Sequence, residues 1–203
     1  MSEIPILLLA AGSSSRMRGR DKLMEEIDGL PLITCQAQKA VAAARGPVLV
    51  TLPAPPHPRY DALRDLSVRT VAVPEAAEGM GASIRTGIRA LPPESPAVML
   101  LLCDLPDLTV DDLQAVLRAR TAQPDKLIWR GATQDGRPGH PIVFAAPCFP
   151  DLAALSGDEG GKSVVAAAGN AVSLVVLPED HARADLDTPE AWAAWRAARN
   201  MRR

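Results

Sequence analysis

Short, unbroken apolar runs alternate with segments of helical pattern along this chain, and this alternation restricts the fold more than any other feature. The apolar runs predict strands at Ile4–Leu9, Val48–Leu52, Val68–Val73, Val98–Leu102, Ile142–Phe144 and Val172–Leu177. The other segments predict helices at Leu32–Ala44, Met80–Ala90, Val110–Thr121, Gly161–Ala168 and Thr188–Arg199. Several runs lack polar alternation, which is typical of strands covered on both faces of a parallel sheet. The sequence therefore predicts an α/β protein with a three-layer α/β/α, Rossmann-like fold and a mostly parallel sheet.

The 203 residues show no change of composition that would mark an interdomain linker, so we expect one domain over residues 1–203. Between Ile128 and Phe144 the spacing becomes irregular and hairpin-like, which predicts a β-rich insertion in that domain. Thr188, Pro189 and Glu190 predict the start of the last helix, because a hydroxyl N-cap followed by proline is a common helix start.

Charge, aromatic content and cysteine spacing limit the function. A net charge of −2 and an aromatic content of 3% argue against a nucleic-acid partner. The three cysteines lack metal-ligand spacing, as expected for buried thiols in a reducing compartment. No apolar run approaches the roughly 20 residues of a membrane helix, and the first run follows Glu3 rather than the bases of a signal peptide. We therefore expect a cytoplasmic protein without a membrane partner.

The segment LLLAAGSSSRMRGRDKL, residues 7–23, carries the first predicted strand into a loop of small, hydroxyl-bearing and cationic residues. Backbone N–H groups and hydroxyls can converge on an anion there. Because ligands of open α/β sheets bind at the carboxyl ends of strands, the loop predicts an oligophosphate site with Arg16 and Lys22 as charge stabilisers. Arg18 and Arg20 either help to bind the phosphates or are simply solvated. Asp21 is the only acid in this loop, beside the four bases Arg16, Arg18, Arg20 and Lys22. The P-loop spacing and the three-glycine dinucleotide fingerprint are both absent.

Carboxylates follow one predicted strand and precede the last predicted helix. Asp104 follows the run 98–102 with one residue, Cys103, between them, and a carboxylate at this position is costly without a cation or donors. Asp185 and Asp187 share one face if their segment is extended. Mg²⁺ prefers one or two carboxylates together with phosphate oxygens and water, so we expect Mg²⁺ on Asp104 with Asp187 or Asp185. The alternative is that these side chains only cap turns and helices.

The loop Leu9–Met17, followed by Lys22 and Leu23, resembles the signature of the molybdenum cofactor nucleotidyltransferases, or MobA-like NTP transferases, and most of all their cytidylyltransferase members. The resemblance continues in EGMGASIRTGI (78–88), LLLCDLPDLT (100–109), GRPGHPIVF (136–144), LSGDEGGKSVV (155–165) and ADLDTPEAW (184–192). It implies catalytic roles for Arg16, Lys22 and Asp104, and an acceptor site with His140, Gly160 and Gly161. It also implies a nucleotide site formed by Leu9, Ala10, Ala11, Gly12, Ser13, Ser15, Arg16, Lys22, Gly79, Met80 and Ser83.

Members of this family transfer a nucleoside monophosphate from a Mg-bound triphosphate to a phosphorylated acceptor and release pyrophosphate. For this chain the resemblance implies transfer of CMP from CTP to an acceptor such as molybdopterin or molybdenum cofactor, with a molybdoenzyme or maturation chaperone as a partner. In the family, Ala-Ala-Gly at residues 10–12 accompanies cytidine transfer and a Gly-Gly version accompanies guanosine transfer. The longer spacing from Met17 to Lys22 is closer to the guanylyl-transferring branch.

Guanylyl transfer and sugar-phosphate nucleotidyl transfer are alternatives on the same fold. An NAD-type oxidoreductase would need the glycine fingerprint and an acid at the end of its second strand, where Pro53 stands. A non-catalytic nucleotide-binding protein would not need Asp104 together with the Asp185 and Asp187 pair.

Overall fold

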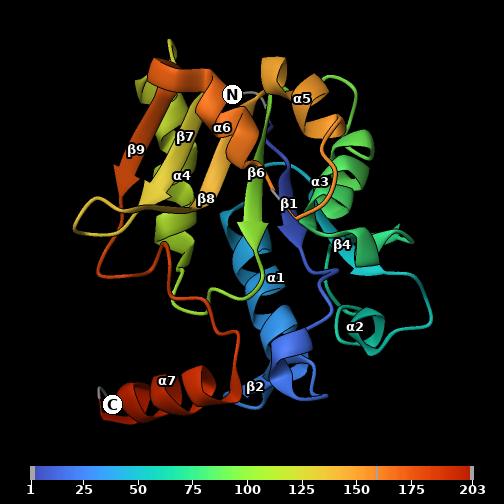
Figure 1. Ribbon diagram of the computed structural model, residues 1–203. Coiled ribbons are helices and arrows are strands. Elements are labelled where there is room, and N and C mark those ends of the chain that lie inside the picture. Colours follow the sequence, from blue (N-terminus) through green and yellow to red (C-terminus); the bar gives the residue numbers. More distant parts are fainter. Residues whose placement is uncertain (1–2, 159, 202–203) are drawn as a thin grey trace.

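A computed structural model describes residues 3–158 and 160–201, and its centre is a seven-stranded sheet (Figure 1). The strand order across the sheet is β5 (Arg69–Val73), β4 (Val48–Pro53), β1 (Ile6–Leu9), β6 (Ala97–Leu102), β8 (Pro138–Ala145), β7 (Ile128–Ala132) and β9 (Val172–Val176). Within the described residues, β8 alone runs antiparallel to its neighbours, so the prediction of a mostly parallel sheet is confirmed. A short antiparallel pair, β2 (Glu26–Ile27) and β3 (Leu30–Pro31), lies apart from it.

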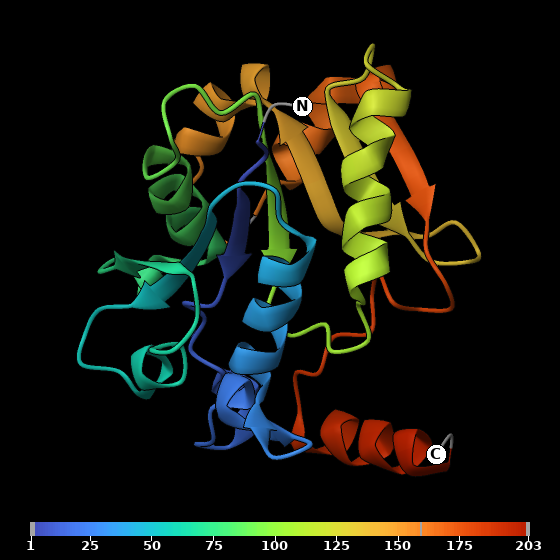
Figure 2. The same ribbon diagram turned by 180° about the vertical axis from the view of Figure 1, so that it is seen from behind.

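Helices cover both faces of the sheet, which confirms the three predicted layers. On one face lie α1 (Leu32–Ala43) and α4 (Val110–Ala122), seen in front in Figure 2. On the other face lie α3 (Met80–Arg89), α5 (Phe149–Ala153) and α6 (Lys162–Ala168). Successive side chains of β1 point to opposite faces, so Ile6 and Leu8 enter the first core and Leu7 and Leu9 the second. Burial on both sides explains why these strands are apolar throughout.

The prediction of a β-rich hairpin between Ile128 and Phe144 is confirmed, but its placement as an insertion is wrong, because this segment forms part of the main sheet. It folds into the antiparallel hairpin β7–β8, and β8 pairs with β6 from Ala97↔Ala145 to Leu100↔Ile142. The irregular spacing has a physical origin in a register shift between Arg130 and Ala132. Such a shift interrupts the two-residue periodicity by which strands are recognised.

Most other predicted elements agree with the structure to within a few residues. The last helix, α7, spans Pro189–Met201, and the Thr188 hydroxyl accepts a hydrogen bond from the Ala191 N–H at 3.2 Å, as its N-cap role requires. Two short helices, α2 (Pro58–Asp61) and α5, were not predicted from the sequence. Among the described helices, none is both long and apolar enough to cross a bilayer.

The order of the strands determines where a ligand can bind. The chain leaves β1 for β4 and β5 on one side and then returns to β6 on the other, so the loops that follow β1 and β6 diverge. The two strands are parallel, with Leu9 opposite Leu102, and their carboxyl ends face the same edge of the sheet, toward α7 (Figure 1). Such a switch point is the usual ligand crevice of an open α/β sheet.

Candidate active site

The loop after β1, residues 10–22, keeps its middle exposed and its two ends fixed; we call it the cationic loop. Met17 is completely buried in the core, whereas Gly12, Ser13 and Ser15 are exposed to solvent. The Ser14 hydroxyl is turned inward: it donates to Asp21 and accepts from the Lys22 N–H, both at 3.2 Å. The exposed part can therefore contact a ligand while the buried part holds its shape.

Arg59 holds this loop against the sheet, and the sequence analysis missed it. Its side chain is 2% exposed. Its guanidinium donates to both carboxylate oxygens of Asp21, at 2.8 and 2.6 Å, and to the Ala10 carbonyl at 2.6 Å. Burial raises the pKa of Asp21, but the hydrogen bonds and charge of Arg59 outweigh it and hold the net pKa below its usual value. Asp21 therefore does not neutralise the loop's own bases; it is the anchor for a buried arginine from α2.

The four bases of the cationic loop have different surroundings. Arg18 pairs with Glu190 and Arg20 with Glu25, so these two connect the loop to neighbouring segments. Arg16 is exposed and reaches Asp187, with its Nη2 2.6 Å from Oδ2. Only Arg16 and Lys22 extend toward the edge of the sheet where β1 and β6 end. The structure thus separates the two predicted charge stabilisers from the two bases considered solvated.

Lys22 lies between two carboxylates from distant parts of the chain. Its Nζ is 2.5 Å from Oδ2 of Asp104 and 2.7 Å from Oδ1 of Asp187. Burial lowers the pKa of Lys22, but the charges of Asp104 and Asp187 outweigh it, and the net pKa lies above its usual value. Lys22 is therefore a fixed positive charge at neutral pH, in contact with Asp104, two residues after the end of β6.

The three predicted metal-ligating carboxylates have different surroundings. Burial raises the pKa of Asp187, but Lys22, Asp185 and Arg16 outweigh it and the net pKa is lowered. Burial, followed by the nearby carboxylates of Asp187 and Asp104, raises the pKa of Asp185. The Leu186 N–H donates to the Asp104 carbonyl at 3.0 Å, which holds residues 185–187 beside the end of β6.

The donor set fits a divalent cation that also takes ligand oxygens. Oδ1 of Asp104 is buried and makes no hydrogen bond among the described residues, a costly state for a carboxylate oxygen. Within residues 3–158 and 160–201, however, no three Asp, Glu, His or Cys side chains are grouped closely enough to hold a metal by themselves. One or two carboxylates completed by phosphate oxygens and water are the usual protein environment of Mg²⁺.

Two adjoining cavities meet at these charged residues. The first, the loop cavity, encloses about 500 Å³ and lies between the cationic loop and the start of α3. All the residues of the predicted nucleotide site line it: Leu9, Ala10, Ala11, Gly12, Ser13, Ser15, Arg16, Lys22, Gly79, Met80 and Ser83. Motifs that are far apart in the sequence therefore line the same cavity.

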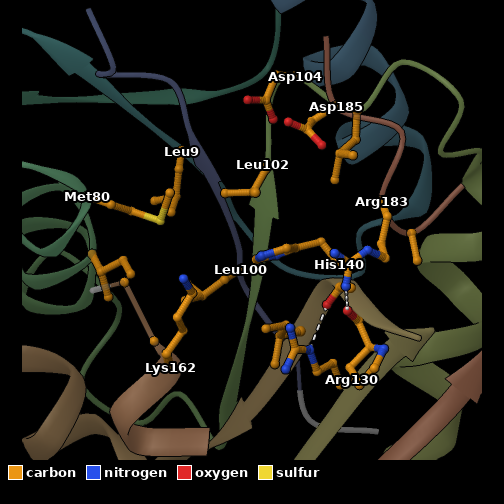
Figure 3. A pocket seen from close by; sticks show the side chains of 18 of the residues that line it. Leu9, Met80, Leu100, Leu102, Asp104, Arg130, His140, Lys162, Arg183 and Asp185 are labelled. Carbon is orange, nitrogen blue, oxygen red and sulfur yellow. Dashed lines mark hydrogen bonds between the residues drawn. The ribbon is translucent and has the colours of Figure 1, made fainter. Parts of the chain in front are cut away.

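The second cavity, the sheet cavity, encloses about 440 Å³ over the carboxyl-terminal half of β6 and the neighbouring β8 (Figure 3). Its walls include His140, Gly160, Gly161, Asp185 and Asp187, which are the predicted acceptor and metal residues not lining the loop cavity. Arg16, Lys22 and Asp104 line both cavities, so a reacting group can be reached from either side.

His140 is uncharged in the sheet cavity. Burial, and then the nearby Arg130, lower the pKa of His140 to about 4. Its Nδ1 is buried without a hydrogen-bond partner among the described residues. At neutral pH His140 therefore carries no charge, but it can form a hydrogen bond with a ligand.

Two glycine-containing turns form the boundary between the cavities. The Gly81 N–H donates to the Gly157 carbonyl at 2.8 Å, and the Met80 N–H donates to Oδ1 of Asp158 at 3.3 Å. Gly79 has φ of +126°, and a Cβ at this position would lie 2.3 Å from the Asp158 carboxylate. Only glycine permits this close approach at residue 79. The turn at residues 79–81 therefore packs tightly against the segment 155–161, of which residue 159 lies outside the described residues.

The fold and the site together define a nucleotidyltransferase: a loop of donors after β1, a lysine held by carboxylates, and two cavities that share these charges. A comparison with protein families agrees, since residues 6–196 match the model of the MobA-like NTP transferase domain. The chain belongs to this family.

The chain is also similar over nearly its whole length to curated relatives and to solved structures. The chain is 29% identical over 205 residues to "Purine catabolism protein PucB" of Bacillus subtilis, covering 95% of each. It is 29% identical to a "Probable molybdenum cofactor guanylyltransferase" of Trichormus variabilis, covering 94% of this chain and 89% of the relative. Its fold is similar to the crystal structure of Rv0371c from Mycobacterium tuberculosis, with a TM-score of 0.79, 24% identity and coverage of 96% and 97%. Rv0371c has also been solved as a complex with manganese.

Proposed function

We propose that this protein is a Mg²⁺-dependent enzyme that transfers CMP from CTP to the phosphate of a molybdopterin-type acceptor and releases pyrophosphate. The observation that carries the proposal is the contact of Lys22 with Asp104 and Asp187 where the two cavities meet. One cavity has the donors that a triphosphate needs, and the other can present the acceptor to the same charges. We take residues 1–203 as one catalytic domain, of which residues 1–2, 159 and 202–203 lie outside the described part.

The nucleophile in this proposal is an oxygen of the acceptor's terminal phosphate, which attacks the α-phosphorus of CTP while the bond to pyrophosphate breaks. The second pKa of a phosphate monoester is about 6, so the nucleophile is already ionised and needs no general base. His140 is neutral and its role is to orient the acceptor by a hydrogen bond. The work of the protein is then positioning and charge neutralisation.

Lys22 and Arg16 bear the charge of the phosphates. The two carboxylates hold Lys22 where the two cavities meet, and a fixed ammonium there would stabilise charge that moves toward the leaving group. Arg16 is more exposed and can move from Asp187 to the phosphates as they enter. The exposed N–H and hydroxyl groups of Gly12, Ser13 and Ser15 complete the donors.

Asp104 and Asp187 would hold Mg²⁺, with Asp185 beside them. When bound, Mg²⁺ supplies Lewis-acid stabilisation of phosphate oxygens. The unpartnered Oδ1 of Asp104 supports this assignment, as does the lowered pKa of Asp187, which keeps its carboxylate ionised.

Selection of cytosine rests on the methyl group of Ala11. Ala11 packs with Val73 and Ala82 in a small buried cluster, and it also lines the loop cavity. A glycine there would leave the space of one methyl group for a larger base. GTP is the second candidate, favoured by the name of the Trichormus relative and by the longer spacing from Met17 to Lys22.

The test is pyrophosphate release with each of the four nucleoside triphosphates, with and without a molybdopterin-type acceptor. We expect release that needs Mg²⁺, the acceptor and CTP. Release with a sugar phosphate in place of the molybdopterin-type acceptor would overturn the acceptor assignment, and dominant release from GTP would overturn the assignment of the base.

A further inference from the structure

Three cations line the sheet cavity at sites that the proposed transfer does not use. Arg130 comes from β7, Lys162 from the start of α6, and Arg183 from the segment that leads to Asp185. In Figure 3, Asp104 and Asp185 lie at the upper end of the cavity, whereas Lys162 and Arg130 lie at the lower end. Leu100 and His140 lie between these ends.

The two arginines are held in place by the main chain of β8. Nε of Arg130 donates to the Gly139 carbonyl at 2.9 Å, and Nη1 of Arg183 donates to the Pro138 carbonyl at 2.9 Å. The backbone around them is tightly packed: the His140 N–H donates to the Ala182 carbonyl at 2.8 Å, and a Cβ on Gly139 would lie 2.1 Å from that carbonyl oxygen. Each guanidinium group is therefore held by a main-chain carbonyl of β8, with Arg130 partly buried and Arg183 exposed to solvent at the cavity wall.

These cations lack the negative partners that neighbouring arginines have. Among the described residues, no carboxylate forms an ion pair with Arg130, Lys162 or Arg183, although most other arginines near the site are paired. Burial, and then the like charge of Arg183, lower the pKa of Arg130, as expected for two guanidinium groups that line the same cavity. Bringing like charges together without counter-charges is unfavourable, and an anionic ligand relieves it.

We propose that the acceptor carries a second anionic group, distant from the phosphate that reacts, and that Arg130 and Arg183 bind it with the help of Lys162. The inference rests on the proposed function, because it takes the sheet cavity as the acceptor site. The reacting phosphate must lie beside Lys22 and Asp104, at the other end of the cavity. The wall between the two ends includes the apolar side chains of Leu100 and Ile142, which suit an uncharged middle part.

A series of ω-carboxyalkyl phosphates tests this, each compared with the primary amide of the same length. The chain is lengthened one carbon at a time, since the optimal length is itself an outcome. Binding is measured by calorimetry on the free protein, without nucleotide, so that the result does not depend on turnover. At the best length we expect the carboxylate to bind at least about tenfold more tightly than its amide, because a charge-assisted pair with arginine is stronger than a neutral hydrogen bond.

Variants then assign the preference to the two arginines. Arg130→Gln and Arg183→Gln should each lower the ratio of carboxylate to amide affinity several-fold and leave the amide's affinity nearly unchanged. Arg130→Lys, which keeps the charge, should keep part of the ratio. Arg118→Gln is the matched control, since it removes one positive charge from an exposed position on α4, outside the cavity, and should leave the ratio unchanged.

Two results would overturn the proposal. One is a series in which no length distinguishes the carboxylate from the amide. The other is an equal loss of both affinities in Arg130→Gln, which would mean that these cations hold the reacting phosphate or only shape the cavity. Failure of the proposed transfer would appear separately, as absence of pyrophosphate release while the binding preference persists.

Discussion

The contact between Arg59 and Asp21 should be the largest single electrostatic contribution to the stability of the cationic loop. Replacing Arg59 by methionine keeps much of the side-chain volume and removes the donors to Asp21 and to the Ala10 carbonyl. Removing one partner of a buried ion pair costs about 3–5 kcal/mol, because the other charge is left uncompensated. The Asp21 side chain is 25% exposed and keeps the N–H of Leu23 as a donor, so we expect the lower end, about 3 kcal/mol.

The assay is urea unfolding at pH 7, with Arg64→Ala as the control. Arg64 pairs with Asp61 on the surface, where both side chains are more than two-thirds exposed, and such pairs contribute about 0–1 kcal/mol. A double-mutant cycle with Asp21→Asn should give a coupling free energy of about 1–3 kcal/mol between Arg59 and Asp21. A free energy of unfolding for Arg59→Met within about 1 kcal/mol of the wild type would refute the reasoning.

Four further predictions concern the same loop and its neighbours. Asp104→Asn should lower kcat by on the order of 10²–10³-fold or more at saturating Mg²⁺ while circular dichroism stays unchanged; retention of a tenth of the activity would contradict this. Lys22→Ala should lower kcat strongly with little change in the KM for the triphosphate, whereas a rise in KM alone would make it a ground-state binder. Ala11→Gly should reduce the preference for CTP over GTP in a competition assay, by no more than the ~10–200-fold that one methyl group provides. The difference in free energy of unfolding between wild type and Asp21→Asn should be complete above pH ~4 and should decrease as the pH falls through the lowered pKa of Asp21; a difference that stays constant as the pH falls below ~4 would contradict it.

The sequence predicted the fold well because its signals are local. Strands covered on both faces must be apolar throughout, and this pattern alone identifies β1, β4 and β6 before any contact is known. The cationic loop and Asp104 were found because the loop directly follows β1 and Asp104 lies two residues after the end of β6. Parallel strands bring their carboxyl ends to one edge, so this position predicts proximity.

The features that were missed depend on contacts between distant segments. Arg59 follows a proline-rich stretch and looks like a surface residue; its partner Asp21 is 38 residues away. The single acid among four bases was the available signal, since a lone carboxylate in such a loop needs a partner. Arg130 and Arg183 meet only because β7 joins the main sheet, and the register shift beside Arg130 hides that strand from a search for periodicity.

The central claim is the transfer of a nucleoside monophosphate, and one measurement tests it most directly. The protein is incubated with Mg²⁺, equal concentrations of CTP and GTP, and a molybdopterin-type acceptor, and the products are identified by mass spectrometry. We predict one equivalent of pyrophosphate for each acceptor that gains CMP through a new phosphate–phosphate bond, and formation of this product at least about 10²-fold more slowly with Asp104→Asn. An acceptor that gains no nucleotide, from either triphosphate, would contradict the account.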